Sequence, residues 1–131
     1  MGEWGVDLEL DWLEDVGRSP RSVVLSPDDR YLYVTLNGEG TVIKIDLDTR
    51  ETIERVRTGD APRSMAISDD GEALYVVNYF SNTVSKLLTD SMEEVQELRT
   101  ADKPIGITVD PLNANVWVSN YSGVLQIFEE Q

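Results

Sequence analysis

The side chains best placed to do chemistry are cations that recur beside prolines. Arg21 and Arg63 each directly follow a proline, and Lys103 directly precedes one. An arginine fork can hold a carboxylate or a phosphate through two parallel hydrogen bonds. If the fold brings the three cations together, they form a candidate anion-binding site. In a ring-shaped fold this site would lie at the mouth of the central channel. The alternative is that they pair with Asp60, Asp102 and neighbouring acids on a solvated rim.

Three aromatic side chains stand in segments rich in turn-forming residues. They are Tyr79, Phe80 and Tyr121. Loops on a rigid scaffold often carry binding residues, and aromatic side chains outside a core are typical of recognition surfaces. These aromatics are therefore a second candidate binding group. The alternative is that they only cover the ends of the strands beside them.

Pairs of carboxylates raise the question of a metal site. Asp46 and Asp48 are two residues apart at the end of a predicted strand, so both could face one calcium ion. The pattern of a calcium-binding loop is absent. Other acids recur at one turn position, where an aspartate side chain accepts hydrogen bonds from nearby backbone amides: Asp28, Asp29, Asp69, Asp70 and Asp110. We therefore expect no metal site.

The chain contains no cysteine and no histidine. Disulfides, thiolate nucleophiles, imidazole bases and every Ser-His or Cys-His catalytic pair are therefore excluded. An enzyme would need a carboxylate of raised pKa or a lysine of lowered pKa as its base. Because no residue stands out in that role, we predict no catalytic residue and no cofactor.

Charge and hydropathy limit the partners. The chain has 131 residues and a net charge of −14, which argues against nucleic acid and against anionic membrane surfaces. No apolar run approaches the length of a membrane span. The first twenty residues are acidic and do not read as a secretory signal. We therefore expect an unidentified protein or small molecule as the ligand.

Residue types repeat along the chain with a period of 42. Such a period predicts a repeat architecture, in which each copy is one structural unit. Four sets of positions share a residue type across three copies: Pro20, Pro62 and Pro104; Leu25, Ile67 and Val109; Tyr33, Tyr75 and Trp117; and Val34, Val76 and Val118.

Each copy divides into four short segments separated by turn formers, and in the second copy these are 64–68, 73–78, 83–88 and 93–99. The middle segments are apolar on both faces, as in a sheet packed between two other sheets. The fourth segment is laced with charge, which is typical of an exposed edge strand. The pattern predicts an all-β protein made of four-stranded antiparallel β-propeller blades, with Tyr33, Tyr75 and Trp117 packed between blades.

Part of this pattern resembles a known repeat family. The second copy contains Pro62-Arg63-Ser64-Met65-Ala66-Ile67-Ser68-Asp69-Asp70-Gly71 and Leu74-Tyr75-Val76-Val77-Asn78. These segments resemble the YVTN-type propeller repeat. The resemblance implies a secreted, periplasmic or cell-surface binding module, or a lactonase-like propeller enzyme. It implies no particular site residue.

Three blades cannot close a propeller ring, which needs about 4 to 8. The expected units are 20–61, 62–103 and 104–131, and the third stops after its third strand, 124–128. We predict that residues 5–14 supply the missing outer strand to a second copy, so that a homodimer closes a six-bladed ring. The alternative is that the chain is a piece of a longer propeller.

Overall fold

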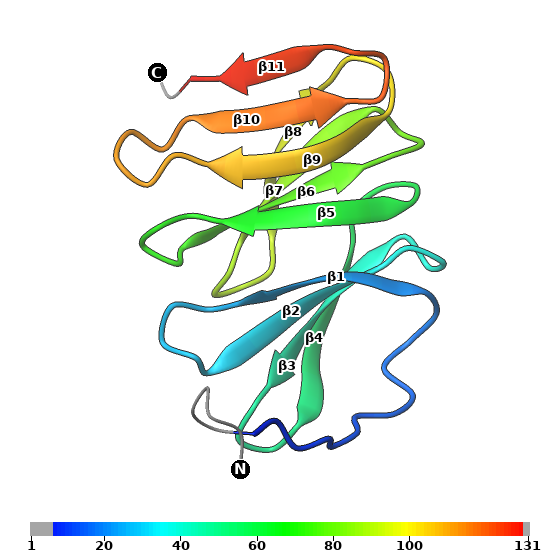
Figure 1. The fold of residues 1–131 in the computed structure, drawn as a ribbon, viewed down its shortest axis with the longest axis vertical. Coiled ribbons are helices and arrows are strands. Elements are labelled where there is room, and N and C mark those ends of the chain that lie inside the picture. The colour runs from blue at the N-terminus through cyan, green and yellow to red at the C-terminus, as the bar shows by residue number, and fades with distance from the viewer. Residues whose placement is uncertain (1–6, 130–131) are drawn as a thin grey trace.

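The computed structural model describes residues 7–129, which form eleven strands and no helix in three antiparallel sheets (Figure 1). The first sheet has the order β1-β2-β3-β4. Its strands are β1 (Pro20–Leu25), β2 (Tyr31–Leu36), β3 (Thr41–Asp46) and β4 (Glu51–Arg57). The second sheet has the order β5-β6-β7-β8. Its strands are β5 (Pro62–Ile67), β6 (Ala73–Asn78), β7 (Thr83–Leu88) and β8 (Glu94–Arg99).

The third sheet has three strands within the described residues. They are β9 (Pro104–Val109), β10 (Val116–Asn120) and β11 (Leu125–Phe128). The prediction of an all-β chain of propeller blades is confirmed. The strand boundaries predicted for the second copy agree with the structure to within two residues.

The blades stack because their middle strands are apolar on both faces. All six residues of β6 are buried, and the first strands of neighbouring blades contact each other. In Figure 1, β9, β5 and β1 lie next to one another, in this order from top to bottom. One core cluster lies between blades one and two, around Tyr33, Leu74 and Val76. A second lies between blades two and three, around Tyr75 and Val118.

Polar side chains also join the blades. The hydroxyl of Thr35 in blade one donates to the carbonyl of Arg63 in blade two at 3.1 Å. Asn78, the last residue of β6, is fully buried. Its Nδ2 donates to Ser85 Oγ at 3.0 Å, and its Oδ1 accepts from the hydroxyl of Thr58, which follows β4, at 2.9 Å. The asparagine that closes the repeat motif therefore ties its blade to the preceding connection.

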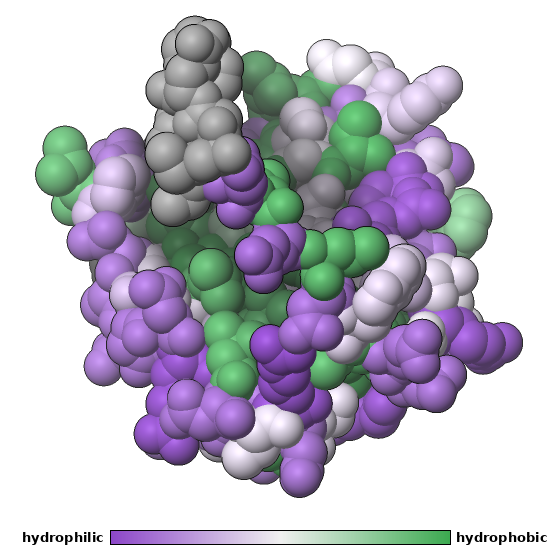
Figure 2. Space-filling model, turned by 60° about the horizontal axis from the view of Figure 1, so that its bottom comes forward, coloured by the Kyte–Doolittle hydropathy of each residue, from purple (hydrophilic) through white to green (hydrophobic). Residues whose placement is uncertain are grey.

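The outward faces of the two terminal blades differ. On blade one, the N-terminal segment runs beside the sheet, and Val16 packs against a buried cluster of Val34, Leu36, Ile43 and Ile45. Figure 2 shows this end of the molecule obliquely, with hydrophobic side chains gathered in its middle and hydrophilic ones around them. On blade three, Trp117, Leu125 and Ile127 are exposed.

Two expectations need comment. Trp117 was expected between blades, like Tyr33 and Tyr75, but it is 43% exposed and faces outward, because no other sheet formed by residues 7–129 covers that side. The expected strand 5–14 is not a strand within the described residues 7–14 of the single chain, and residues 5 and 6 lie outside the described part. Because that expectation concerned pairing with a second copy, it stays a prediction.

No helix among residues 7–129 has the length and apolar character to cross a membrane.

Candidate functional site

Equivalent corners precede the first strand of each blade. The corner residues are Ser19, Ala61 and Lys103, and all three have a positive φ of 56° or 57°. In the second blade, the carbonyl of Ala61 accepts from the backbone N–H of Tyr79 at 2.9 Å. In the third, the carbonyl of Lys103 accepts from the N–H of Tyr121 at 2.8 Å. The fold therefore places the candidate aromatic loops against the same corners as the candidate cations.

The corner of the second blade holds a cation and two rings in contact. The guanidinium carbon of Arg63 lies 3.9 Å from the centroid of the Tyr79 ring, within cation–π range. The rings of Tyr79 and Phe80 meet edge to face, with centroids 5.1 Å apart. Phe80 is 67% exposed. We call Arg63, Tyr79 and Phe80 the aromatic corner.

Arg63 has no ion pair among residues 7–129. Its Nε is buried without a hydrogen-bond partner, so this donor is closed to solvent. A guanidinium that stacks on a ring and has no ion pair can bind a carboxylate through its outer nitrogens while the ring contacts an apolar group. The aromatic corner therefore has the composition of a binding hot spot.

The other predicted site residues are less closely joined. Arg21 is exposed on β1. Lys103 Nζ lies 3.7 Å from Asp102 Oδ2, the rim pairing that the alternative reading expected, whereas Asp60 pairs with Arg57 at 3.3 Å. Tyr121 is 73% exposed at the corner of the third blade. The structure thus joins Arg63 to Tyr79 and Phe80 but joins neither Arg21 nor Lys103 to them by a direct contact.

The recurring aspartates act as turn caps. Ser68 Oγ donates to Asp70 Oδ1 at 2.6 Å, and the same oxygen accepts from the N–H of Glu72 at 2.9 Å. Asp28 makes the equivalent bonds with Ser26 and Arg30 in the first blade. The serine hydroxyl and the backbone N–H lower the pKa of both aspartates, because each bond stabilises the charged form.

The aspartate pair at the end of β3 is engaged by a cation. Arg30 lies 3.6 Å from Asp46 and 3.9 Å from Asp48, and Asp46 Oδ1 also accepts from the N–H of Asp48 at 2.8 Å. Among the described residues there is no group of three or more acidic side chains arranged to hold a metal ion.

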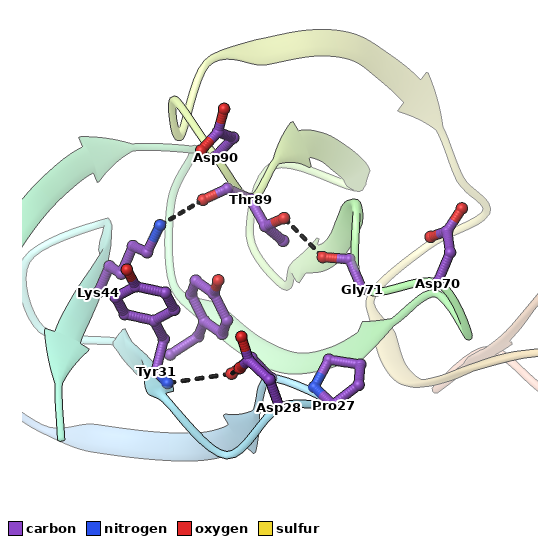
Figure 3. A pocket seen from close by; sticks show the side chains of 10 residues that line it. Pro27, Asp28, Tyr31, Lys44, Asp70, Gly71, Thr89 and Asp90 are labelled. Carbon is purple, nitrogen blue, oxygen red and sulfur yellow. Dashed lines mark hydrogen bonds between the residues drawn. The ribbon is translucent and has the colours of Figure 1, made fainter.

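A pocket that sequence reasoning missed lies between the turns of blades one and two (Figure 3). It has a volume of about 210 Å³. Lys44 from β3 is buried in its wall, and its Nζ donates to the carbonyl of Thr89 at 2.7 Å. The same ammonium lies 4.2 Å from the centroid of the Tyr31 ring. Burial raises the pKa of neighbouring Tyr33.

The contacts of Lys44 are those of a lysine that joins two blades. Its ammonium reaches from β3 of blade one to the end of β7, where the hydroxyl of Thr89 in turn donates to Gly71 O at 2.6 Å. Lys86 occupies the equivalent place opposite Tyr75, at 5.7 Å from the ring centroid. Tyr33 pairs with Lys44 across β2 and β3, as Tyr75 pairs with Lys86 across β6 and β7. This Tyr-Lys pair recurs at the 42-residue period and is the signal that could have revealed the pocket.

The sequence matches one family of known proteins. Residues 10–126 match the family model described as the Cytochrome D1 heme domain. No curated protein is detectably similar in sequence to this chain.

Many solved structures share the fold. A hydrazine synthase from Kuenenia stuttgartiensis superposes with a TM-score of 0.82 at 22% identity, covering 95% of this chain and 36% of that one. A putative 6-phosphogluconolactonase from Bacteroides fragilis has a TM-score of 0.79 at 22% identity, covering 86% and 35%. The Swd1 β-propeller domain from Myceliophteria thermophila has a TM-score of 0.79 at 17% identity, covering 88% and 36%.

At these identities the likeness shows the fold alone. The chain spans about a third of the length of the structures that it resembles.

Proposed function

This chain belongs to the Cytochrome D1 heme domain family, and on that premise we propose that it is a non-catalytic propeller module that binds a protein segment. The aromatic corner supports this proposal: Arg63 stacks on Tyr79 and has no ion pair within residues 7–129, and it lies beside an exposed Phe80. The ligand that fits is a peptide carrying a carboxylate next to an apolar side chain. We also propose that the chain is a YVTN-type binding module, as the repeat motif suggests.

The family name raises the question of a haem, and the first strands of the three blades offer no accessible side chain that fits its iron. Haem iron is held in proteins by His, Cys, Met or Tyr side chains. The chain has no histidine or cysteine, and β1, β5 and β9 carry no tyrosine. Their one methionine, Met65, is buried in the core between blades. These three strands therefore supply no ligand to a haem iron.

A lactonase-like enzyme is the other function that the fold resemblance suggests. Such an enzyme would need a base at neutral pH, and a carboxylate serves best when its pKa is raised toward that pH. The hydrogen bonds at Asp28 and Asp70 lower their pKa instead. Lys44 is bound to a backbone carbonyl in the interior. Asp28, Asp70 and Lys44 therefore act in turns and between blades, and none of the three has the properties of such a base.

Selection from a displayed library of random peptides tests the proposed function. We expect the recovered peptides to share an acidic residue beside an apolar one. Because the corner joins a cation to an aromatic surface, Arg63→Ala and Phe80→Ala should each lower the affinity for the best peptide by about tenfold. Leu112→Ala, at a highly exposed site in the β9–β10 turn, is the matched control. Peptides that bind all of these variants equally well would contradict the proposal.

A further inference from the structure

The pocket between blades one and two is formed by two complete four-stranded sheets. Its lining residues belong to the β1–β2 turn, β2 and β3 of blade one, and to the β5–β6 turn and the turn after β7 of blade two (Figure 3). The volume of about 210 Å³ exceeds the roughly 10 to 15 Å³ needed for one water molecule, but is below the roughly 300 Å³ of sites for drug-sized ligands. A small organic molecule fits a cavity of this size.

Lys44 brings a buried cation into the wall of this pocket. The residue is only 5% exposed. Within residues 7–129 its ammonium makes one hydrogen bond, to the carbonyl of Thr89 at 2.7 Å, and no ion pair. An ammonium has three N–H donors, and a buried charge is stabilised when its donors find acceptors. The wall therefore favours a ligand that presents an oxygen acceptor to Lys44.

Three carboxylates line the same pocket. They belong to Asp28, Asp70 and Asp90, and all three residues are exposed. Hydrogen bonds from a serine hydroxyl and a backbone N–H lower the pKa of Asp28 and of Asp70, so both are charged at neutral pH. With one lysine and three aspartates, the lining has a formal net charge of −2. The pocket therefore attracts a cation and repels an anion.

Two tyrosines show how closely these charges surround the pocket. Burial raises the pKa of Tyr33, and the negative charges of Asp28 and Asp90 raise it further, because they disfavour a phenolate beside them. The ring of Tyr31 lies 4.2 Å from Lys44 Nζ. In the view of Figure 3, Asp28 and Asp90 lie on opposite sides of the hydrogen bond from Lys44 to the next blade. The acids and the lysine thus face one small space.

The cation next to the pocket is engaged elsewhere. The guanidinium carbon of Arg30 lies 5.4 Å from the centroid of the Tyr31 ring. Its nitrogens pair with Asp46 at 3.6 Å and with Asp48 at 3.9 Å. Arg30 therefore pairs with carboxylates outside the pocket and with none of the three that line it.

We propose that this pocket binds a small hydroxylated amine, of the class of amino alcohols. The ammonium of the ligand lies among the three aspartates, and its hydroxyl oxygen accepts a hydrogen bond from Lys44 Nζ. In both serine-capped turns the hydrogen bonds use Oδ1 of the aspartate, which leaves Oδ2 of Asp28 and of Asp70 for charge-assisted bonds to the ligand. The carbon atoms of the ligand lie against the ring of Tyr31.

A ligand that has only one of the two groups fits less well. An amine without a hydroxyl gives Lys44 no acceptor, and a neutral alcohol does not use the negative charge of the lining. A carboxylate in place of the hydroxyl would meet the repulsion of three aspartates. The aromatic corner lies at the opposite end of β5 from Asp70, so this inference does not depend on the proposed function.

NMR titration of the 131-residue chain with three small molecules tests the proposal. Ethanolamine, propylamine and 1,2-ethanediol have the same number of non-hydrogen atoms and differ only in their end groups. We expect ethanolamine to shift the signals of Tyr31, Gly71 and Thr89 with a dissociation constant of about 10 mM or lower. The other two molecules should bind about tenfold more weakly, because each lacks one charge-assisted hydrogen bond. No shift with ethanolamine, or equal binding of all three molecules, overturns the proposal.

A charge-removing variant tests the place of the ligand's ammonium. Asp90→Asn should weaken the binding of both amines by about two- to fivefold and leave 1,2-ethanediol unchanged. Asp102→Asn is the matched control, because Asp102 is an exposed acid that pairs with Lys103 in the corner of the third blade. Both substitutions are at the surface and keep the shape of the side chain. Equal effects of the two variants on ethanolamine overturn the proposal.

A variant of the buried lysine tests the place of the ligand's hydroxyl. Lys44→Met keeps an unbranched side chain in the wall and removes the ammonium. If this chain folds, it should bind ethanolamine and propylamine equally well, and a preserved tenfold preference for ethanolamine overturns the assignment of the hydroxyl to Lys44. If it does not fold, the selectivity of the wild type and the Asp90→Asn comparison decide.

Discussion

At the residue scale, a serine hydroxyl at the first turn of blades one and two lowers the pKa of one aspartate in each. Ser26 and Ser68 occupy the same position in successive copies, and each donates to the aspartate two residues later. Because the bond stabilises the carboxylate, it lowers the aspartate pKa in the folded chain. A carboxyl group of lowered pKa stabilises the fold above its unfolded-state pKa, and this contribution is lost as the pH falls through its folded-state pKa.

Removing one hydroxyl should therefore raise one pKa. In Ser68→Ala we expect the pKa of Asp70 to rise toward its usual value, while the pKa of Asp28 stays where it is. The loss of stability relative to the wild type should be present at neutral pH and shrink in the acid range, where both proteins have a protonated Asp70. Carboxyl-carbon NMR titration measures both pKa values in one sample. If the pKa of Asp28 shifts as much as the pKa of Asp70 in the Ser68→Ala protein, the two turns are not independent.

At the scale of the element, the turn between β5 and β6 depends on a glycine. Gly71 has a φ of 76°, and a Cβ built there would lie 2.8 Å from Cδ of Pro27 in the neighbouring blade. Gly71→Ala should lower the free energy of unfolding by about 1 to 3 kcal/mol. The alanine would have an unfavourable backbone conformation, and its Cβ would also overlap with Pro27 of the neighbouring blade. Urea denaturation measures the change.

Gly123 provides the matched control for this substitution. Its φ of 93° also disfavours a side chain, but nothing lies within 4 Å of the added Cβ. Gly123→Ala should therefore show only the backbone part of the cost, about 1 kcal/mol. Equal losses at the two positions would mean that the Pro27 contact relaxes without cost.

The 42-residue period predicted the blades because each copy repeats the residues that make its turns and cores. It did not show which blade faces are left exposed, so Trp117 was expected between blades and lies exposed. The period also carries a repeated Tyr-Lys pair, but it does not show the contact of Lys44 with the carbonyl of Thr89, which lies 45 residues away in the neighbouring blade. The contact of Arg63 with Tyr79 likewise needed the fold, since it joins a strand to a loop 16 residues away.

At the scale of the whole molecule, net charge opposes assembly. Each copy carries −14, so two copies repel each other, and this repulsion acts over the Debye length of the solution. In the homodimer predicted from the sequence, the outer faces of the first and third blades, which would meet, are mainly apolar. Repulsion between the copies should therefore outweigh the local attraction at low salt.

Raising the salt concentration should for this reason tighten the dimer. Between about 20 mM and 300 mM NaCl the Debye length falls from roughly 20 Å to below 10 Å, so the repulsion between copies is screened while apolar contacts persist. We expect the dissociation constant from sedimentation equilibrium to fall several-fold over this range. A dissociation constant that rises with salt would instead mean that opposite charges across the junction hold the two copies together.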